Sequence, residues 1–393
     1  MDIKNIIWHS RASAESDWRC QRARYYLYNY EGGIVKDNLT LPLFIGNCIH
    51  DGVAGIATQS VLNGAADIDT IATDANKLVY ETLKEYYYPE VEFPKESAEW
   101  LLAMEQSTLV EAVLRGFYRL SWPAIFAKYP NFFKSETETI FPHDSCGKLN
   151  KKGPFVYKAK PDLVLAGEDG LLYFEIKSTS SKKPEWVTSW NYAPQVHGTA
   201  KAIEFTYGKD VLGTIIQGFY KGYSQYGKYS SVLVYGYAGK GNPPFTKVTY
   251  SPDYRAGLKR TPVWEMEGGV KMWIEKLPLE TLSEQFPQTP LIPTNEGLAE
   301  DFFRQRAIRE QDVKIEAAKI KEPSFKEFKQ LSLDTFFPQS FSQCSPSFGS
   351  PCEFLNICHG TPQAKEDPLN HGFAKRDREH NDGYKILTEQ LLG

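Results

Sequence analysis

Asp162, Glu175 and Lys177 are the residues whose types and spacing could carry out chemistry. The alternation of apolar and polar residues predicts two strands, residues 162–166 and 171–178, joined by a Gly-Glu-Asp-Gly turn. In this register Asp162 lies opposite Glu175, with Cβ atoms about 5 Å apart, and Lys177 follows on the same face. Two carboxylates so close destabilise a hairpin, and a divalent cation bound to their oxygens would compensate. The alternative is an ordinary hairpin with one exposed acid and one exposed lysine.

A cation at two carboxylates beside an ammonium group is suited to phosphodiester hydrolysis. The cation would activate water and neutralise charge on the phosphate, and the ammonium group would add to this stabilisation. Residues 148–183 hold eight lysines and four acidic residues, whereas the whole chain of 393 residues has a net charge of −4. We interpret this local excess as a surface that faces phosphate groups, with a solvated lysine-rich loop as the alternative.

The sequence Pro161-Asp162, followed by Glu175-Ile176-Lys177, resembles the PD-(D/E)XK motif of restriction-endonuclease-like nucleases. This resemblance implies that Asp162, Glu175 and the Ile176 carbonyl bind Mg²⁺ or Mn²⁺. It also implies that Lys177 activates water or stabilises the transition state. The expected fold class is α/β: a restriction-endonuclease-like core with a mixed central sheet flanked by helices.

A histidine in a predicted helix extends the resemblance to the RecB-like subgroup. The helix should begin near Leu43, and His50 follows Gly46 by four residues, as the metal-binding histidine of that subgroup follows a glycine. The resemblance therefore implies that His50 is a metal ligand. Glu111 could approach the same metal, although we expect it to be solvated, and we expect His197 to be structural.

The resemblance also implies residues that contact DNA. RecB-like nucleases carry a Gln-x-x-x-Tyr motif on a helix facing DNA, and Gln195 matches its first residue, whereas Thr199 stands at the tyrosine position. Lys160, Ser178 and Lys182 flank the predicted catalytic hairpin and are the further candidates for phosphate contacts.

Three cysteines in a Pro-, Ser- and Gly-rich segment, Cys344-x7-Cys352-x5-Cys358, indicate a second metal site that orders this segment. The fourth ligand is either His359, which would form a zinc site, or Cys20. The set with Cys20 resembles iron-sulfur RecB-like nucleases, including the AddB nuclease domain and the CRISPR-associated and phage exonucleases. One cysteine precedes the nuclease core and three follow it in that group. This resemblance implies a 4Fe-4S cluster, with zinc as the alternative.

The remaining elements must position these residues. We predict an N-terminal helical region (1–134), a nuclease core (135–290), a C-terminal helix and cluster segment (291–360) and a polar, mobile tail (361–393) with a closing helix near Ile386. Helices are expected from Ser16 through Cys20 and over residues 67–92, 97–120, 194–205 and 296–321, with a short amphipathic segment at 270–277. Further strands are expected over residues 136–141, 211–220 and 231–236, and a loop over 239–262.

The order of these motifs predicts a DNA nuclease, and we expect an exonuclease acting on single-stranded DNA or DNA ends. The alternatives are a non-catalytic DNA-binding or assembly subunit and a zinc-stabilised endonuclease for particular structures or sites. Expected partners are DNA and recombination or replication proteins. No apolar run approaches the ~20 residues that cross a bilayer, so no membrane partner is expected. The expected location is the cytoplasm of a prokaryote or of a phage-infected host, where disulfides are disfavoured.

Overall fold

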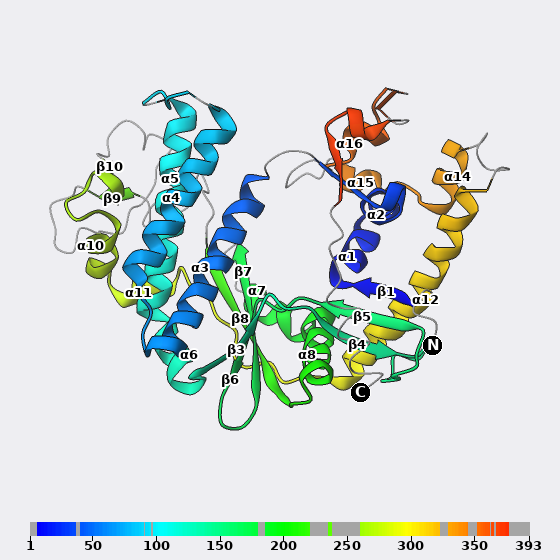
Figure 1. Ribbon diagram of the computed structural model, residues 1–393, viewed down its shortest axis with the longest axis horizontal. Helices are drawn as coiled ribbons and strands as arrows, with labels where there is room; N and C mark the ends of the chain where they lie inside the picture. Colours follow the sequence, from blue (N-terminus) through cyan, green and yellow to red (C-terminus); the bar gives the residue numbers. More distant parts are fainter. Residues whose placement is uncertain are drawn as a thin grey trace.

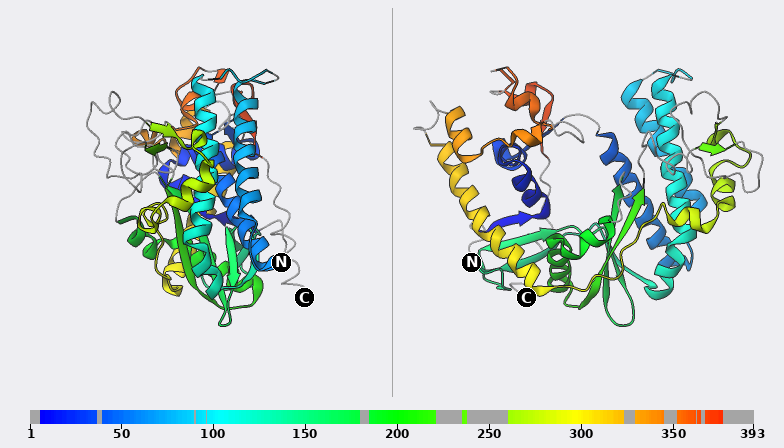
Figure 2. Two further views of the ribbon diagram at one scale, coloured as in Figure 1. Left: turned by 90° about the vertical axis from the view of Figure 1, so that its left-hand side faces the viewer. Right: turned by 180° about the vertical axis from the view of Figure 1, so that it is seen from behind.

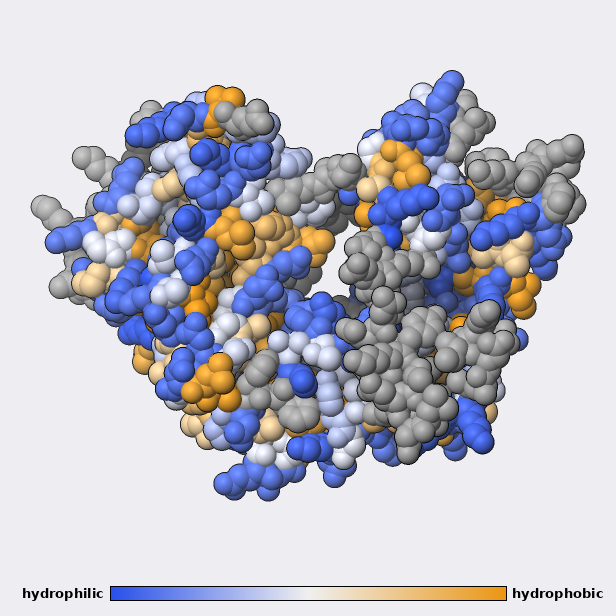
Figure 3. Space-filling view, in the orientation of Figure 1, coloured by the Kyte–Doolittle hydropathy of each residue, from blue (hydrophilic) through white to orange (hydrophobic). Residues whose placement is uncertain are grey.

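A computed structural model of the chain describes residues 6–36, 40–89, 91–95, 97–179, 185–220, 235–237, 260–322, 329–344, 352–361, 363–364 and 367–376. These residues form a mixed α/β structure in which two arms of helices rise from a base of β-sheets (Figure 1). The view from behind shows the same two arms (Figure 2). In the space-filling view the molecule is hollowed between them (Figure 3).

A four-stranded sheet lies at the centre of the base, in the order β3-β6-β7-β8. Its strands are β3 (Asn131–Ser135), β6 (Leu163–Ala166), β7 (Leu171–Thr179) and β8 (Val211–Tyr220). The β6–β7 hairpin has the predicted register, with Ala166 opposite Leu171 and Leu163 opposite Phe174. Antiparallel β3 and parallel β8 complete the sheet, so the expectation of a mixed central sheet is confirmed.

Three long helices of one arm cover the first face of this sheet. They are α3 (Leu41–Asn63), α4 (Ile68–Tyr87) and α5 (Ala98–Leu120), followed by the short α6 (Trp122–Lys128). Leu172, Phe174 and Ile176 of β7 are buried in the same core as the apolar faces of these helices. A Cβ atom at Gly52 would lie 2.5 Å from the side chain of Leu114, so the glycine lets α3 approach α5 closely.

Helix α8 (Pro194–Tyr207) covers the opposite face, where Ala200 and Ile203 pack against Val164 and Tyr173. A second sheet has the order β1-β5-β4, formed by β1 (Ile7–Ser10), β5 (Phe155–Ala159) and β4 (Thr139–His143). Strand β1 is parallel to β5, so the N-terminal segment is part of the base.

The second arm joins segments from the two ends of the chain. It contains α1 (Arg11–Arg19), α2 (Gln21–Tyr28), α12 (Glu296–Ile320), α14 (Lys329–Phe336), α15 (Phe341–Cys344) and α16 (Leu355–Cys358). Strands β2 (Ile34–Lys36) and β11 (Phe373–Lys375) pair antiparallel beside them. Tyr25 and Tyr26 share a buried core with Phe337 and Phe354, which fixes the N-terminal helices to the C-terminal segment.

The remaining elements are short. They are η2 (Tyr30–Gly32), α7 (Glu185–Ser189), η3 (Trp190–Tyr192), β9 (Tyr235–Tyr237), β10 (Arg260–Pro262), η5 (Val263–Glu265), α10 (Gly269–Lys276), α11 (Leu279–Ser283) and η6 (Pro368–Asn370). Among the described helices, none is long and apolar enough to cross a membrane.

Several predicted elements differ from the structure. The expected helix through Cys20 is two helices, because Cys20 has an extended backbone (φ −162°, ψ 115°) between α1 and α2. The N-terminal region to residue 134 is not purely helical, since it supplies β1, β2 and β3. The strand expected over residues 136–141 is β4 at Thr139–His143, and β11 places part of the expected polar tail in a sheet. Residues 231–234, most of the loop over 239–262, and Ile386 lie outside the described residues.

Candidate functional site

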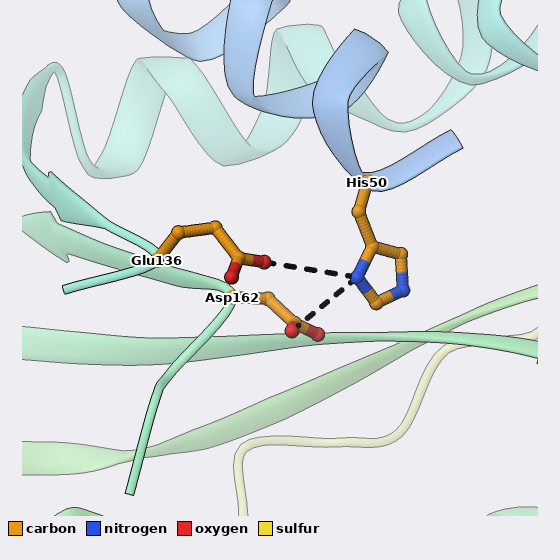
Figure 4. A group of neighbouring side chains, drawn as sticks. All are labelled: His50, Glu136 and Asp162. Carbon is orange, nitrogen blue, oxygen red and sulfur yellow. Dashed lines mark ion pairs between the residues drawn. The ribbon is translucent and has the colours of Figure 1, made fainter. Parts of the chain in front are cut away.

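A histidine and two carboxylates meet where α3 faces the central sheet (Figure 4). The Nδ1 atom of His50 lies 3.4 Å from Oδ1 of Asp162 and 3.9 Å from Oε1 of Glu136. One ligand atom from each residue lies within 4.8 Å of those of the other two. We call His50, Glu136 and Asp162 the metal-ligand group.

Asp162 is held at the start of β6 by the neighbouring strand. Its Oδ2 accepts a 2.6 Å hydrogen bond from the backbone N–H of Ile176. The N–H and C=O of one strand residue point to the same edge, so the Ile176 carbonyl points toward the Asp162 side of β7. The structure thus brings together His50, Asp162 and the Ile176 backbone, as the motifs predicted.

Glu136 was missed because we expected it to begin a strand. It instead lies in the loop between β3 and β4 with a left-handed backbone (φ +50°), which is uncommon for a residue other than glycine. The Glu136 N–H donates to the Pro161 carbonyl over 3.1 Å, which holds this conformation beside the motif. The one feature of the sequence that pointed to Glu136 as a metal ligand was its carboxylate side chain.

Glu175 is adjacent to the metal-ligand group but is not a member of it in this structure. Its two carboxylate oxygens accept hydrogen bonds from the Tyr173 hydroxyl and the Lys177 ammonium group. Glu175 is only 5% exposed, whereas the Lys177 side chain is 21% exposed. A ligand role for Glu175 would therefore require its carboxylate to turn from these two donors.

Electrostatics around the group favour neutral forms of the two central ligands. Burial, followed by the nearby Glu175 charge, raises the pKa of Asp162 well above its usual value. Burial and the Lys177 charge lower the pKa of His50. A metal ion would replace the proton of Asp162, while the neutral imidazole offers a lone pair for coordination.

The predicted DNA contacts do not form one cluster around this group. Lys160 is 58% exposed and its ammonium group lies 2.6 Å from Oε2 of Glu136. Gln195 is partly exposed in the first turn of α8, and Ser178 lies near the end of β7. Thr199 is buried, with its hydroxyl 3.3 Å from that of Tyr157, so it is part of the core. Lys182 lies outside the described residues.

Glu111 and His197 have structural partners elsewhere. Glu111 accepts hydrogen bonds from Arg115 at 2.9 Å and from Asn76 at 2.8 Å, and its side chain is 14% exposed, so the expectation of a solvated residue was wrong. The His197 ring bonds to the Asn191 carbonyl and accepts from the Asn295 N–H, as expected of a structural histidine.

The four cysteines predicted to bind a cluster lie together in the second arm. The Cys352 N–H donates to the Cys344 carbonyl over 3.1 Å, and the Ser340 N–H donates to the Cys20 sulfur over 3.5 Å. Burial raises the pKa of Cys358 to about 12, with Arg22 opposing this rise and the neighbouring Cys352, Cys20 and Cys344 contributing to it. The cysteine group therefore consists of Cys20, Cys344, Cys352 and Cys358.

Among the described residues, no three thiols of the cysteine group, with or without His359, have ligand atoms all within 4.8 Å of one another in this structure. The buried Arg22, bonded to the Phe337 carbonyl at 2.8 Å, is close enough to lower the pKa of Cys358.

Comparison with known proteins adds no assignment: no protein-family model matches the chain, and a search of curated proteins found no match.

Proposed function

We propose that this protein is a metal-dependent deoxyribonuclease that acts as an exonuclease on single-stranded DNA or DNA ends. The observation that carries the proposal is the metal-ligand group, with three ligand atoms within 4.8 Å of one another. Lys177 and Glu175 stand beside it on β7. A cation site next to a partly exposed ammonium group is suited to phosphodiester hydrolysis.

The donor set fits Mg²⁺ or Mn²⁺. Carboxylate oxygens suit both ions, and the imidazole nitrogen of His50 favours Mn²⁺ over Mg²⁺ because Mg²⁺ prefers oxygen ligands. His50, Glu136 and Asp162 would hold the ion, and the Ile176 carbonyl points to the same edge of β7. A cation bound there would polarise a phosphate oxygen and make a water molecule more acidic.

The side chains around the ion would have separate tasks. Lys177 would donate to a non-bridging phosphate oxygen as negative charge develops during attack by water. Glu175 accepts a hydrogen bond from Lys177 and so orients the lysine. The Ile176 N–H fixes Oδ2 of Asp162, which leaves Oδ1 directed at the ion.

The cysteine group would hold a 4Fe-4S cluster, with zinc as the alternative. A cubane cluster separates its four thiolates by iron and sulfide atoms, so it needs wider spacing than one ion does. The group joins α1–α2 to the C-terminal segment, which suits a structural role. A negatively charged cluster would also be balanced in part by the Arg22 guanidinium.

The test is cleavage of end-labelled linear and closed circular single-stranded DNA by anaerobically purified protein with Mg²⁺, Mn²⁺ or EDTA. Metal-dependent loss of the linear substrate alone is the expected result, and the labelled end gives the polarity. Cutting of the circle would identify an endonuclease. Binding of DNA without cleavage under any metal would overturn the enzyme proposal in favour of a DNA-binding subunit.

A further inference from the structure

A cavity of about 610 Å³ with a cationic wall lies in the second arm, and none of its lining residues belongs to the metal-ligand group. It is bounded by β1, α2 and the C-terminal half of α12. Its walls carry five cationic side chains and one carboxylate: Arg24, Lys158, Lys314, Lys321, Arg376 and Glu310. A volume of this size is typical of small-molecule sites.

The single carboxylate does not neutralise the cavity. Glu310 accepts hydrogen bonds from Arg24 and also from Arg306, a buried arginine behind the wall. Lys314 and Lys321 are exposed on the α12 side. Lys158 is paired with Glu138 at 2.9 Å, which leaves four cationic side chains facing one lining carboxylate. A net positive charge therefore remains, and an anion would be attracted.

Two buried polar side chains at the cavity wall have atoms without a hydrogen-bond partner among the described residues. Arg24 is 3% exposed, and its Nε and Nη1 atoms have no acceptor there; the nearest Asp17 oxygen lies 4.0 Å from Nε. The Nδ1 atom of buried His9 has no partner among the same residues. Burying a polar group without a partner is unfavourable, and a bound ligand that contacts this wall would offset that cost.

Aromatic and apolar side chains also line the cavity, which therefore suits a ligand larger than an inorganic phosphate ion. The guanidinium of Arg376 lies 4.5 Å from the Tyr28 ring centre, and Lys158 lies 5.8 Å from that of Trp8. Val313 and Ala317 contribute apolar surface. Proteins that bind nucleotides regardless of the base combine cationic side chains with aromatic rings on which the base stacks.

We propose that this cavity binds a nucleoside phosphate, with the phosphate near Arg24 and the two α12 lysines and the nucleoside toward the rings. The ligand is either a free nucleotide or one unit of a DNA strand. Lys158 of the cavity lies two residues before Lys160, the partner of Glu136. A DNA strand bound at the metal-ligand group could therefore extend along β5 to the cavity. Binding of a DNA strand rests on the proposed nuclease function, whereas binding of a free nucleotide does not.

The test is isothermal titration calorimetry in EDTA, which keeps the metal centre out of the measurement. The probes are inorganic phosphate, adenosine monophosphate, ATP and a short single-stranded oligonucleotide. The double variant Lys314→Glu/Lys321→Glu should weaken binding of the tightest probe at least about tenfold, equivalent to ~1.4 kcal/mol. Lys319→Glu is the matched control, because Lys319 is exposed on the same helix and does not line the cavity.

Tighter binding of nucleotides than of inorganic phosphate supports the proposal and identifies a free nucleotide. Binding of the oligonucleotide alone, lost in the double variant, identifies a DNA strand. Three results would overturn the proposed nucleotide site. The first is no saturable binding of nucleotide or oligonucleotide, and the second is equal affinity for phosphate and nucleotides. The third is an equal effect of the double variant and of Lys319→Glu on binding. Nucleotide binding by a protein that cuts no DNA would leave this site standing while the proposed nuclease function fails.

Discussion

Asp162 accepts a hydrogen bond from the Ile176 N–H at one carboxylate oxygen and faces His50 with the other, at 2.6 and 3.4 Å. The carboxylate is therefore oriented by the backbone of β7 before any metal binds. Glu136 approaches the same point from a loop whose backbone is held by the Pro161 carbonyl. Three separate segments of the chain thus converge on one small volume.

Replacing Glu136 by glutamine should weaken Mn²⁺ binding by about tenfold or more, because a charged ligand is lost while its shape is kept. Binding is measured by titration calorimetry on the metal-free protein. Glu138→Gln is the matched control, since Glu138 pairs with Lys158 rather than with the metal-ligand group. Equal Mn²⁺ affinity of both variants would exclude Glu136 as a ligand.

Lys177→Ala should lower the cleavage rate constant by about 10²–10³-fold, because a donor to the developing phosphate charge is lost. DNA binding should change little, and filter binding in EDTA checks this. Wild-type cleavage rates in the variant would remove Lys177 from the mechanism.

Tyr173→Phe should lower kcat for cleavage by about 10- to 100-fold, the size of effect that follows loss of a supporting partner beside a metal site. The Tyr173 hydroxyl donates to Glu175, which in turn accepts from Lys177, so Tyr173 acts as a positioning residue for the lysine. Its loss should change kcat, with KM for DNA and the Mn²⁺ concentration for half-maximal activity unchanged. A change in KM alone would contradict this role.

Cys358→Ala should remove any visible iron-sulfur absorbance and lower the unfolding temperature, since cluster binding and folding are coupled. Cys146→Ala is the control, because Cys146 is exposed and outside the cysteine group. Full iron content in the Cys358 variant, measured against the control, would show that the ligands are assigned wrongly.

A buried histidine pair should make stability fall in mild acid. The Nδ1–H of His143 donates to the Asp144 carbonyl, so its Nε2 accepts from His9 over 2.7 Å. Burial lowers the pKa of His143 from 6.5 to about 4 and that of His9 well below 6.5. The unfolded chain therefore binds more protons, and stability is lost as pH falls from 6.5 toward 4, by up to ~1.4 kcal/mol per pH unit for each histidine.

Urea unfolding of wild type and His143→Gln at about pH 7 and about pH 5 checks this sign. The variant should show a shallower loss of stability between the two conditions, whatever its absolute stability. Exposed His371 provides the control variant His371→Gln, which should keep the wild-type slope. An unchanged slope in His143→Gln would refute the assignment.

Local sequence patterns were sufficient to predict the strands and helices that carry the motifs. The alternation in β6 and β7 gave the hairpin register because each strand buries apolar residues on a fixed face. The long helix α5 was likewise predictable from apolar spacing and from the capping Ser97.

Features that depend on distant pairing were not predictable in this way. Strand β1 has only four residues, and it is stabilised by parallel pairing with β5, far along the chain. The left-handed turn at Glu136 depends on the Pro161 carbonyl. Neither contact follows from a periodic pattern in the sequence. Glu136 could therefore be identified as the third member of the metal-ligand group only from the structure.

The core shared by Tyr25, Tyr26, Phe337 and Phe354 has a consequence for biosynthesis. A ribosome releases α2 long before it makes the segments that cover these tyrosines. Nascent chains therefore expose an aromatic surface until the C-terminal segment has been made, and such surfaces are prone to aggregation.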